Sequence, residues 1–180
     1  AGVAALSVHR GGKGACAMSE PRAVLGIDPG AAGAAVAIDL ESSLLSVFDM
    51  PGGKDIPAME MARWVREQME GYDPRNVQVG IEMTPEAMPP GMSSTSSMVK
   101  LARNAGVWEG IVAGQGFRYA RVSPTSWKAA MGLKGKDKRD SLAVAQREFP
   151  WAEAYFRRVK DVGRADAALI ALYAARRLRL

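Results

Sequence analysis

The stretch VLGIDPGAAGAAVAIDL, residues 24–40, contains two apolar runs joined by a short turn. The first run ends in a single acidic residue, Asp28, and the dipeptide Pro29-Gly30 follows it at once. This pattern predicts two strands separated by a turn, with a carboxylate at the end of the first strand. A buried carboxylate is costly unless it is paired or hydrogen-bonded. The sequence must therefore be searched for groups that could pair with Asp28.

The rest of the chain alternates between strand and helix patterns. Three strands, predicted over residues 23–28, 33–40 and 44–49, are followed by a helix over 57–70, a strand over 76–82, a helix over 96–114 and a strand over 118–122. Several helices complete the chain, namely a short one around residue 127 and two longer ones over 138–149 and 164–178. This is the element order of the ribonuclease-H-like fold, an α/β fold in which helices flank a five-stranded mixed sheet. The absence of repeats and long linkers predicts one domain over residues 23–180. Residues 1–22, rich in Ala and Gly and basic, are expected to form a disordered or transit-like tail.

The composition restricts the chemistry that the domain can perform. The single cysteine, Cys16, and the single histidine, His9, precede it, which excludes a Ser-His-Asp triad, a Cys-His pair and a zinc site. Any catalysis must use carboxylates, lysines, arginines or hydroxyls, and we expect no organic cofactor. A net charge of +5 and a pI of about 9.6 favour a partner that carries phosphates. No apolar run reaches the roughly 18–20 residues that span a bilayer, so we expect no membrane partner.

Acidic residues stand where this fold would bring them together. Asp28 ends the first strand, Glu82 ends the fourth, and Asp166 lies in the first turn of the final helix, with Asp161 just before that helix. The first and fourth strands are neighbours in a sheet of this order, so their carboxylates would project from one edge. Such acids repel one another unless divalent cations bind between them, and oxygen ligands suit Mg²⁺ or Mn²⁺. Two ions about 3.5–4 Å apart can activate a water and hold a phosphate.

Each acid also has an ordinary structural interpretation when it is considered alone. Asp28 before Pro-Gly is typical of a turn, and Asp166 early in a helix is typical of a partner for the helix dipole. Glu82 at a strand end is typical of a solvated edge charge. Their joint placement on the elements of this fold favours the metal site.

Four stretches, in this order, resemble the motifs of the RuvC-like Holliday junction resolvases. They are VLGIDPGAAGAAVAI, VGIEMTPEAMPPGMSSTSSMVKLARNAGVWEGIVA, RVSPTSWKAAMGLKGKDKRDSLAVAQREFP and KDVGRADAALIALYA. The resemblance covers roughly residues 23–178, almost the whole predicted domain. The forms WKAAMGL and KDVGRA resemble most closely the chloroplast branch, the monokaryotic chloroplast resolvases.

The resemblance implies a Mg²⁺- or Mn²⁺-dependent crossover junction endodeoxyribonuclease with two ions in its active site. It would bind four-way DNA junctions as a homodimer and nick two strands of like polarity symmetrically. Asp28, Glu82 and Asp166 would be metal ligands, with Asp161 as the fourth, although Val162 stands where relatives carry His or Asp. The chloroplast branch favours the plastid nucleoid as the location, and a bacterial or phage cytoplasm stays open.

The same resemblance places lysines near the active site, and Lys128 and Lys138 match them. An ammonium group beside the scissile phosphate would offset developing negative charge. Further DNA contacts are expected from basic residues and from methionines that could wedge into the centre of a junction, namely Lys134, Lys136, Arg139, Arg164, Met83, Met88 and Met92. The alternatives are a solvated charge run and a loop whose methionines fill a gap in the core. Trp64 and Trp151 are interpreted as core, and Trp108 as either core or a dimer face.

Two other functions are compatible with parts of the pattern. A nuclease-dead DNA-binding or architectural protein could share the fold, but it would not need the three placed acids. The Gly-Ile-Asp-Pro-Gly segment also resembles the phosphate loop of sugar kinases and actin-like ATPases. A chain of 180 residues has no room for the second lobe of those proteins.

Overall fold

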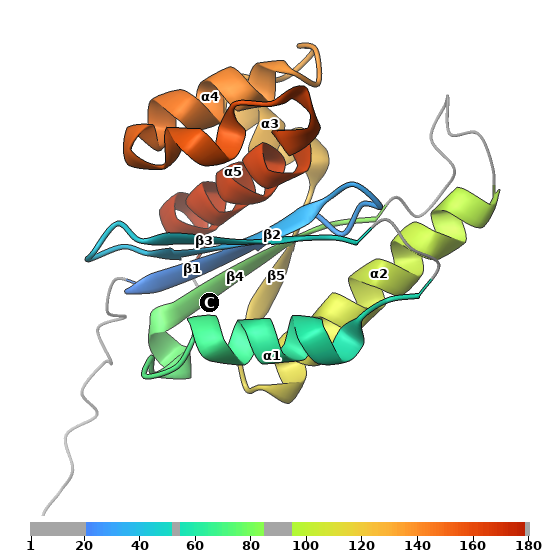
Figure 1. Cartoon of the computed structure of the whole chain (residues 1–180), viewed down its shortest axis with the longest axis vertical. Coiled ribbons are helices and arrows are strands. Elements are labelled where there is room, and N and C mark those ends of the chain that lie inside the picture. The colour runs from blue at the N-terminus through green and yellow to red at the C-terminus, as the bar shows by residue number, and fades with distance from the viewer. Residues whose placement is uncertain (1–20, 52–54, 85–94, 179–180) are drawn as a thin grey trace, which may run out of the picture.

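A mixed sheet forms the centre of the computed structural model, which describes residues 21–51, 55–84 and 95–178 (Figure 1). Over those residues the strands lie in the order β3-β2-β1-β4-β5. They are β1 (Ala23–Ile27), β2 (Ala34–Asp39), β3 (Leu45–Asp49), β4 (Val77–Glu82) and β5 (Tyr119–Val122). Strands β1, β2 and β3 pair antiparallel, whereas β4 pairs parallel with both β1 and β5. The predicted five-stranded mixed sheet is confirmed.

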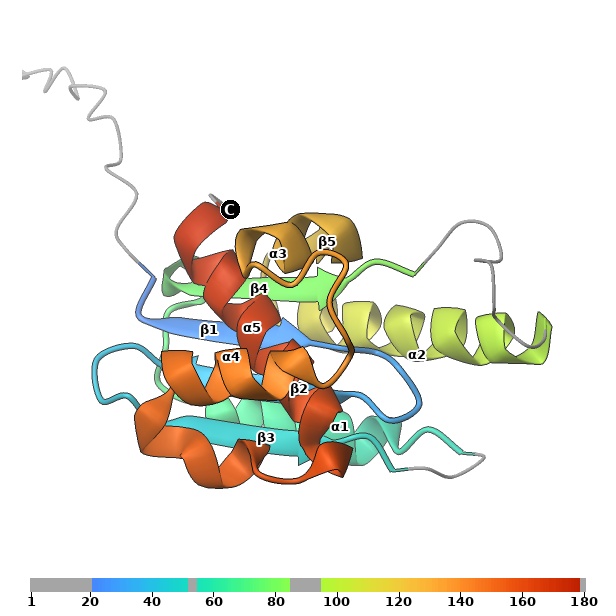
Figure 2. The same ribbon diagram turned by 90° about the horizontal axis from the view of Figure 1, so that it is seen from above.

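Helices cover both faces of this sheet. Helices α1 (Ala58–Gln68) and α2 (Thr95–Gly114) lie on one face, and α3 (Pro124–Ala130), α4 (Asp140–Glu148) and α5 (Val162–Arg177) lie on the other (Figure 1). Short 3-10 segments at Pro74–Asn76, Pro150–Phe156 and Val159–Asp161 connect them. Figure 2 shows that α5 runs across the strands rather than along them. No helix in the described ranges is long and apolar enough to cross a bilayer.

The two faces of the sheet bury different side chains because successive residues of a strand point to opposite sides. Leu25, Ile27 and Ile81 pack in the layer beneath α1 and α2. Val24 and Val36 pack in the layer that α5 covers. Residues at even positions of β1 therefore face α5, and this parity decides where the acid that follows β1 lies.

Gly26 allows α5 to contact the sheet backbone directly. A Cβ on Gly26 would lie 2.1 Å from the carbonyl oxygen of Ala167 and 2.4 Å from the backbone nitrogen of Ala171. Both atoms belong to the backbone of α5, so a side chain at position 26 could be accommodated only if the helix moved. The close contact fixes the height of α5 above β1.

The predicted elements agree with the structure to within about two residues at each end. The prediction for Trp151 was wrong, because this residue is 55% exposed and lies on the 3-10 segment, where its ring makes an edge-to-face contact with Phe149. Trp108 is fully buried and belongs to the core, so it does not form a dimer face. Trp64 is partly buried against Phe48. The predictions for residues 1–20, Met88 and Met92 lie outside the described residues.

Candidate active site

The pairing of β1 with β4 brings Asp28 and Glu82 together. These strands are parallel, with Ile27 opposite Ile81, so the next residue of each chain stands at the same edge of the sheet. The alternation of side chains then directs both carboxylates toward the face that α5 covers. The predicted meeting of these two acids is confirmed by the strand register.

Asp166 reaches the same edge from above. It lies on the inward face of α5, between Gly163 one turn before it and Ile170 one turn after it. A Cβ on Gly163 would lie 2.1 Å from the carbonyl oxygen of Ala32, so the start of α5 rests on the loop that follows Asp28. Ile170 covers Gly80 of β4. Asp166 is buried, and its charge is felt by Glu82.

Burial raises the pKa values of all three carboxyl groups, and the charge of Asp28 raises those of Glu82 and Asp166 further. Burial is the main cause for each of them. It raises the pKa of Glu82 to about 7, with the neighbouring charge of Asp28 adding to the effect. The pKa of Asp166 rises to about 6, and that of Asp28 also rises, although the backbone N–H of Gly30 opposes the shift with a hydrogen bond of 2.9 Å. Perturbed carboxyl groups of this kind are typical of functional sites.

Three hydrogen-bonding residues that support the acids were not predicted from the sequence. The indole N–H of Trp127 donates to Oε2 of Glu82 at 2.8 Å. The amide of Asn104, buried on α2, donates to the carbonyl oxygen of Pro29 at 3.1 Å and holds the turn after Asp28. The hydroxyl of Ser141 donates to the carbonyl oxygen of Lys138 at 2.9 Å, and its proximity lowers the pKa of Asp166. The role of Asn104 could have been predicted from the sequence, because Asn104 is a polar residue on the otherwise apolar face of its helix.

Lys128 and Lys138 both lie near the acids. Lys128 is close enough to lower the pKa values of all three acids, and Lys138 those of Asp28 and Asp166. The Nζ atom of Lys128 also lies 5.2 Å from the centre of the Trp127 ring. The other three predicted basic residues of this region are exposed on the segment between α3 and α4, namely Lys134, Lys136 and Arg139.

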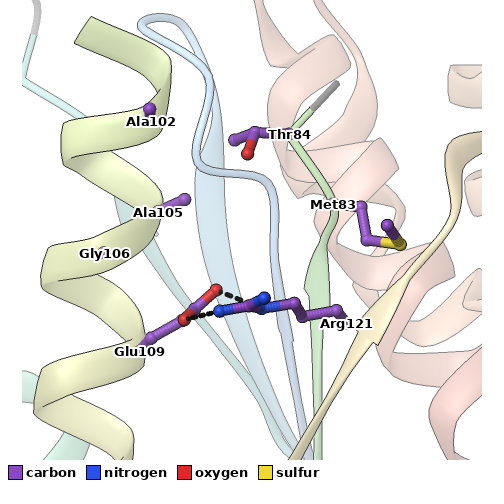
Figure 3. Close-up of a pocket in the computed structure, with 7 residues that line it drawn as sticks. All are labelled: Met83, Thr84, Ala102, Ala105, Gly106, Glu109 and Arg121. Atoms are coloured by element: carbon purple, nitrogen blue, oxygen red, sulfur yellow. Dashed lines mark hydrogen bonds and ion pairs between the residues drawn. The ribbon is translucent and has the colours of Figure 1, made fainter. Parts of the chain in front are cut away.

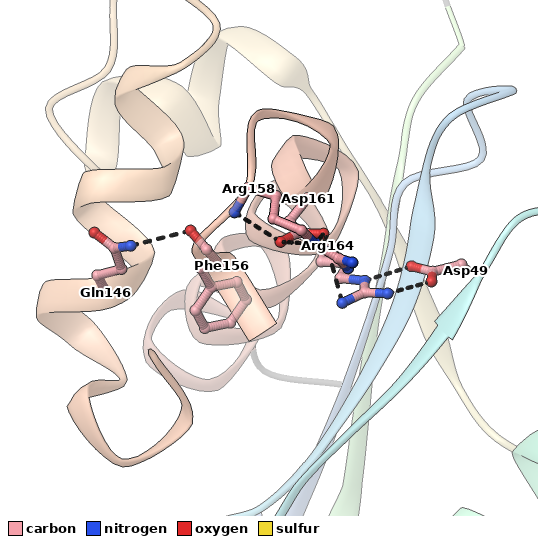
Figure 4. Close-up of polar contacts among 6 residues, drawn as sticks. All are labelled: Asp49, Gln146, Phe156, Arg158, Asp161 and Arg164. Atoms are coloured by element: carbon pink, nitrogen blue, oxygen red, sulfur yellow. Dashed lines mark hydrogen bonds and ion pairs between the residues drawn. The ribbon is translucent and has the colours of Figure 1, made fainter. Parts of the chain in front are cut away.

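Asp161 and Arg164 form a separate ionic cluster (Figure 4). Arg158 donates to Asp161 from its guanidinium at 2.8 Å and from its backbone nitrogen at 2.9 Å. Arg164 lies 3.6 Å from the same carboxylate and donates to Asp49 at 2.6 Å. Burial alone would raise the pKa of Asp161, but these arginines outweigh it and the pKa is lowered.

Both residues of this cluster already have partners in the structure. Asp161 precedes the first residue of α5, and its carboxylate accepts from Arg158 across the preceding 3-10 turn. Arg164 pairs with Asp49 and Asp161, so its guanidinium joins α5 to β3. The roles of Asp161 as a fourth ligand and of Arg164 as a DNA contact stay predictions.

Met83, the residue after Glu82, lines a pocket of about 210 Å³ between β4, β5 and α2 (Figure 3). Small side chains of α2 form one wall, and an ion pair between Glu109 and Arg121, 2.7 Å long, crosses the pocket. The remaining lining residues are Thr84, Ala102, Ala105 and Gly106. Met83 thus follows Glu82 directly and lines this pocket, and its role as a DNA contact stays a prediction.

The three acids fit a hard divalent cation by donor type and by charge. Carboxylate oxygens are the ligands that Mg²⁺ and Mn²⁺ prefer. None of the ion pairs among the described residues includes Asp28, Glu82 or Asp166, so their charge is not neutralised by a bonded cation. Within the same ranges, no three acidic, histidine or cysteine side chains converge tightly enough to enclose one ion. Water or a substrate phosphate would have to complete the coordination.

The raised pKa values predict that stability without divalent ions falls as pH rises. The folded state binds more protons than the unfolded state between the unfolded pKa of these groups, near 4, and the folded pKa of Glu82, about 7. The free energy of unfolding should therefore decrease by on the order of 2–4 kcal/mol from pH 5 to pH 8. Urea unfolding in EDTA at both pH values measures this difference. The Glu82→Gln variant should show a smaller decrease, and a wild-type stability that is equal or higher at pH 8 would contradict the assignment.

The sheet order, the acids at the ends of β1 and β4 and the acid on α5 define the class: an α/β chain of the ribonuclease-H-like fold with an acidic centre. Two solved structures share this fold, namely Thermus thermophilus RuvC and the same protein in complex with a Holliday junction substrate. Both have a TM-score of 0.54, and each match covers 83% of this chain. RuvC alone is 20% identical and is matched over 91% of its own chain, and RuvC with the junction is 19% identical and is matched over 90%.

A curated relative gives a more particular likeness. The chain is 42% identical to the chloroplastic Holliday junction resolvase MOC1 of Chlamydomonas reinhardtii over 72 residues. These 72 residues are 39% of this chain. The match spans about 8% of the length of that relative. No family model matches the sequence. The resemblance to the RuvC-like resolvases and to their chloroplast branch is confirmed.

Proposed function

We propose that this chain is a structure-selective endonuclease that resolves four-way DNA junctions by divalent-metal-dependent nicking of two strands of like polarity. The observation that carries the proposal is the placement of Asp28 and Glu82 side by side at one sheet edge with Asp166 above them. The likeness to the chloroplastic resolvase and to RuvC bound to a junction supports it.

In this proposal Asp28, Glu82 and Asp166 hold Mg²⁺ or Mn²⁺, with two ions in the site. The bound ions would supply an activated water and stabilise the leaving oxygen of the phosphodiester. Lys128 and Lys138 would offset the negative charge that develops on the phosphate. Lys134, Lys136 and Arg139 would contact the DNA backbone, because exposed cations give affinity that does not depend on sequence. Met83 would approach the unstacked bases; the same role for Met88 and Met92 rests on the sequence alone.

The proposed substrate also favours a homodimer. A four-way junction presents two strands of like polarity, and two copies of the chain would place one acidic site at each. The plastid is the proposed location, supported by the name of the curated relative and by the transit-like composition of residues 1–22. Residues 23–180 are proposed as the nuclease domain.

The decisive experiment compares a synthetic four-way junction with a linear duplex of the same sequence. In Mg²⁺ or Mn²⁺ we expect paired, symmetric nicks in the junction and little cleavage of the duplex, with no cleavage in EDTA. The expectation follows from the acidic site, because a divalent ion held by these carboxylates would activate the attacking water. Junction binding without cleavage under any divalent ion would instead support the nuclease-dead architectural alternative, and equal cleavage of both substrates would contradict the structure selectivity.

A further inference from the structure

Trp127 makes a contact that the proposed chemistry leaves unassigned. Its side chain lies on α3, is fully buried, and donates its Nε1–H to Oε2 of Glu82 at 2.8 Å. The two residues are 45 positions apart in the sequence. Burial in a close-packed core and the hydrogen bond to Glu82 both restrict the orientation of the indole.

The contact restricts Glu82 in a specific way. An indole N–H can only donate, so it binds an acceptor oxygen and cannot itself take a proton from the carboxylic acid. A carboxylate has two oxygens and about four acceptor positions, and the indole occupies one position on Oε2. With that oxygen held, rotation of the carboxylate plane is limited, and Oε1 is left for another partner.

The residue that follows adds charge at the same place. Lys128 lies over the indole ring at 5.2 Å, and its ammonium group acts on all three acids. Helix α3 thus presents a neutral donor to Glu82 and a cation to the acidic centre from consecutive residues. A neutral donor orients a carboxylate without neutralising it, so the charge of Glu82 stays available to a metal ion.

We propose that Trp127 is a positioning residue that orients the Glu82 carboxylate for a divalent cation. This inference rests on the proposed function only in assuming that Glu82 is a metal ligand. Hydrogen-bond partners of metal ligands set ligand orientation, and their loss typically weakens metal binding by about 10–100-fold.

The test measures metal binding directly, apart from cleavage. We expect Trp127→Phe, which removes the N–H and keeps an aromatic ring, to weaken Mn²⁺ binding by about 10-fold or more in titration calorimetry. Trp108→Phe is the matched control, because Trp108 is equally buried and its Nε1 has no hydrogen-bond partner in the described part of the chain. This control should bind Mn²⁺ within about twofold of wild type. Unchanged affinity in Trp127→Phe, or an equal loss in both variants, would overturn the proposal.

Two further measurements separate positioning from packing. In a Glu82→Gln background, the Trp127→Phe change should have no further effect on Mn²⁺ affinity, because the group it acts through is already altered. In the wild-type protein, the indole N–H resonance of Trp127 should shift on titration with Mg²⁺ while that of Trp108 does not, which needs no folded variant at position 127. A Trp127 resonance that is unmoved at saturating Mg²⁺ would also overturn the proposal. If Mn²⁺ binding falls as expected but no variant or wild type nicks junctions, the proposed function fails and the role of Trp127 stands.

Discussion

The Asp28→Asn variant is expected to lose junction nicking in Mg²⁺ by on the order of 10³-fold or more while it still binds junctions. Asp28 stands next to Glu82 at the sheet edge, so its loss removes one of two carboxylates that are held by backbone pairing. Asparagine has nearly the same shape and can still accept the hydrogen bond from the Gly30 N–H. The change therefore removes the charge and leaves the turn intact. Single-turnover cleavage and a binding assay in EDTA measure the two properties separately.

A matched variant controls for loss of one negative charge. Glu70→Gln changes an exposed residue in the turn before β4, at the strand's opposite end from Glu82. It should cleave at the wild-type rate. Nicking by Asp28→Asn at a rate close to wild type would rule out the metal site at this edge. A parallel loss of junction binding in that variant would show that Asp28 serves DNA binding instead.

The Gly26→Ala variant is expected to be the most damaging small substitution for folding. Its new methyl group would lie 2.1 Å from the carbonyl oxygen of Ala167 and 2.4 Å from the nitrogen of Ala171, and neither backbone atom can rotate away. Overpacking of a core usually costs about 1–3 kcal/mol. Since a whole helix must move here, we expect about 4 kcal/mol or more. For a chain of this size the melting temperature would fall by roughly 10 °C or more, measured by circular dichroism.

Gly106→Ala is the control for this substitution. Gly106 lies inside α2, and apart from the helix's own nearby backbone no atom of the described residues lies within 4 Å of the added Cβ. Alanine favours a helix interior over glycine by roughly 0.5–1 kcal/mol, so this variant should be as stable as wild type or slightly more stable. A Gly26→Ala protein that melts within a few degrees of wild type would show that α5 does not rest on β1 as closely as described.

Much of this arrangement could be predicted from the sequence because the signals were local. Apolar runs ending in acids predicted the β1 and β4 strand ends, and the element order placed those strands side by side. The position of Asp166 followed from the apolar face of the last helix. These features depend on periodicity and topology, which a sequence expresses directly.

The sequence did not predict which donor each carboxylate would bind or which aromatic side chain would be exposed. These contacts depend on several possible partners, some close in the sequence and some far apart. Asp161 is close to Asp166 in sequence, but the carboxylate of Asp161 is bound by Arg158, which lies three residues before Asp161. The contact from Trp127 to Glu82 joins two elements, and no local pattern specifies which donor an acid will meet. Trp151 is large and aromatic, yet it sits on a surface 3-10 segment, since hydrophobicity alone does not determine burial.

The close seating of α5 on β1 has a consequence for how the acidic centre responds to its own charge. Asp28 and Glu82 stand at the ends of strands β1 and β4, and Asp166 stands on α5, which contacts β1 at Gly26 and the loop after Asp28 at Gly163. The buried apolar face of α5 holds the helix on the sheet, so an outward movement that separates the like charges would expose core side chains to water. The molecule can relieve the repulsion by taking up a proton or by taking up a cation. Protons and metal ions therefore compete for the same three carboxylates. Raising the pH should release the protons and so increase the affinity of this centre for divalent cations.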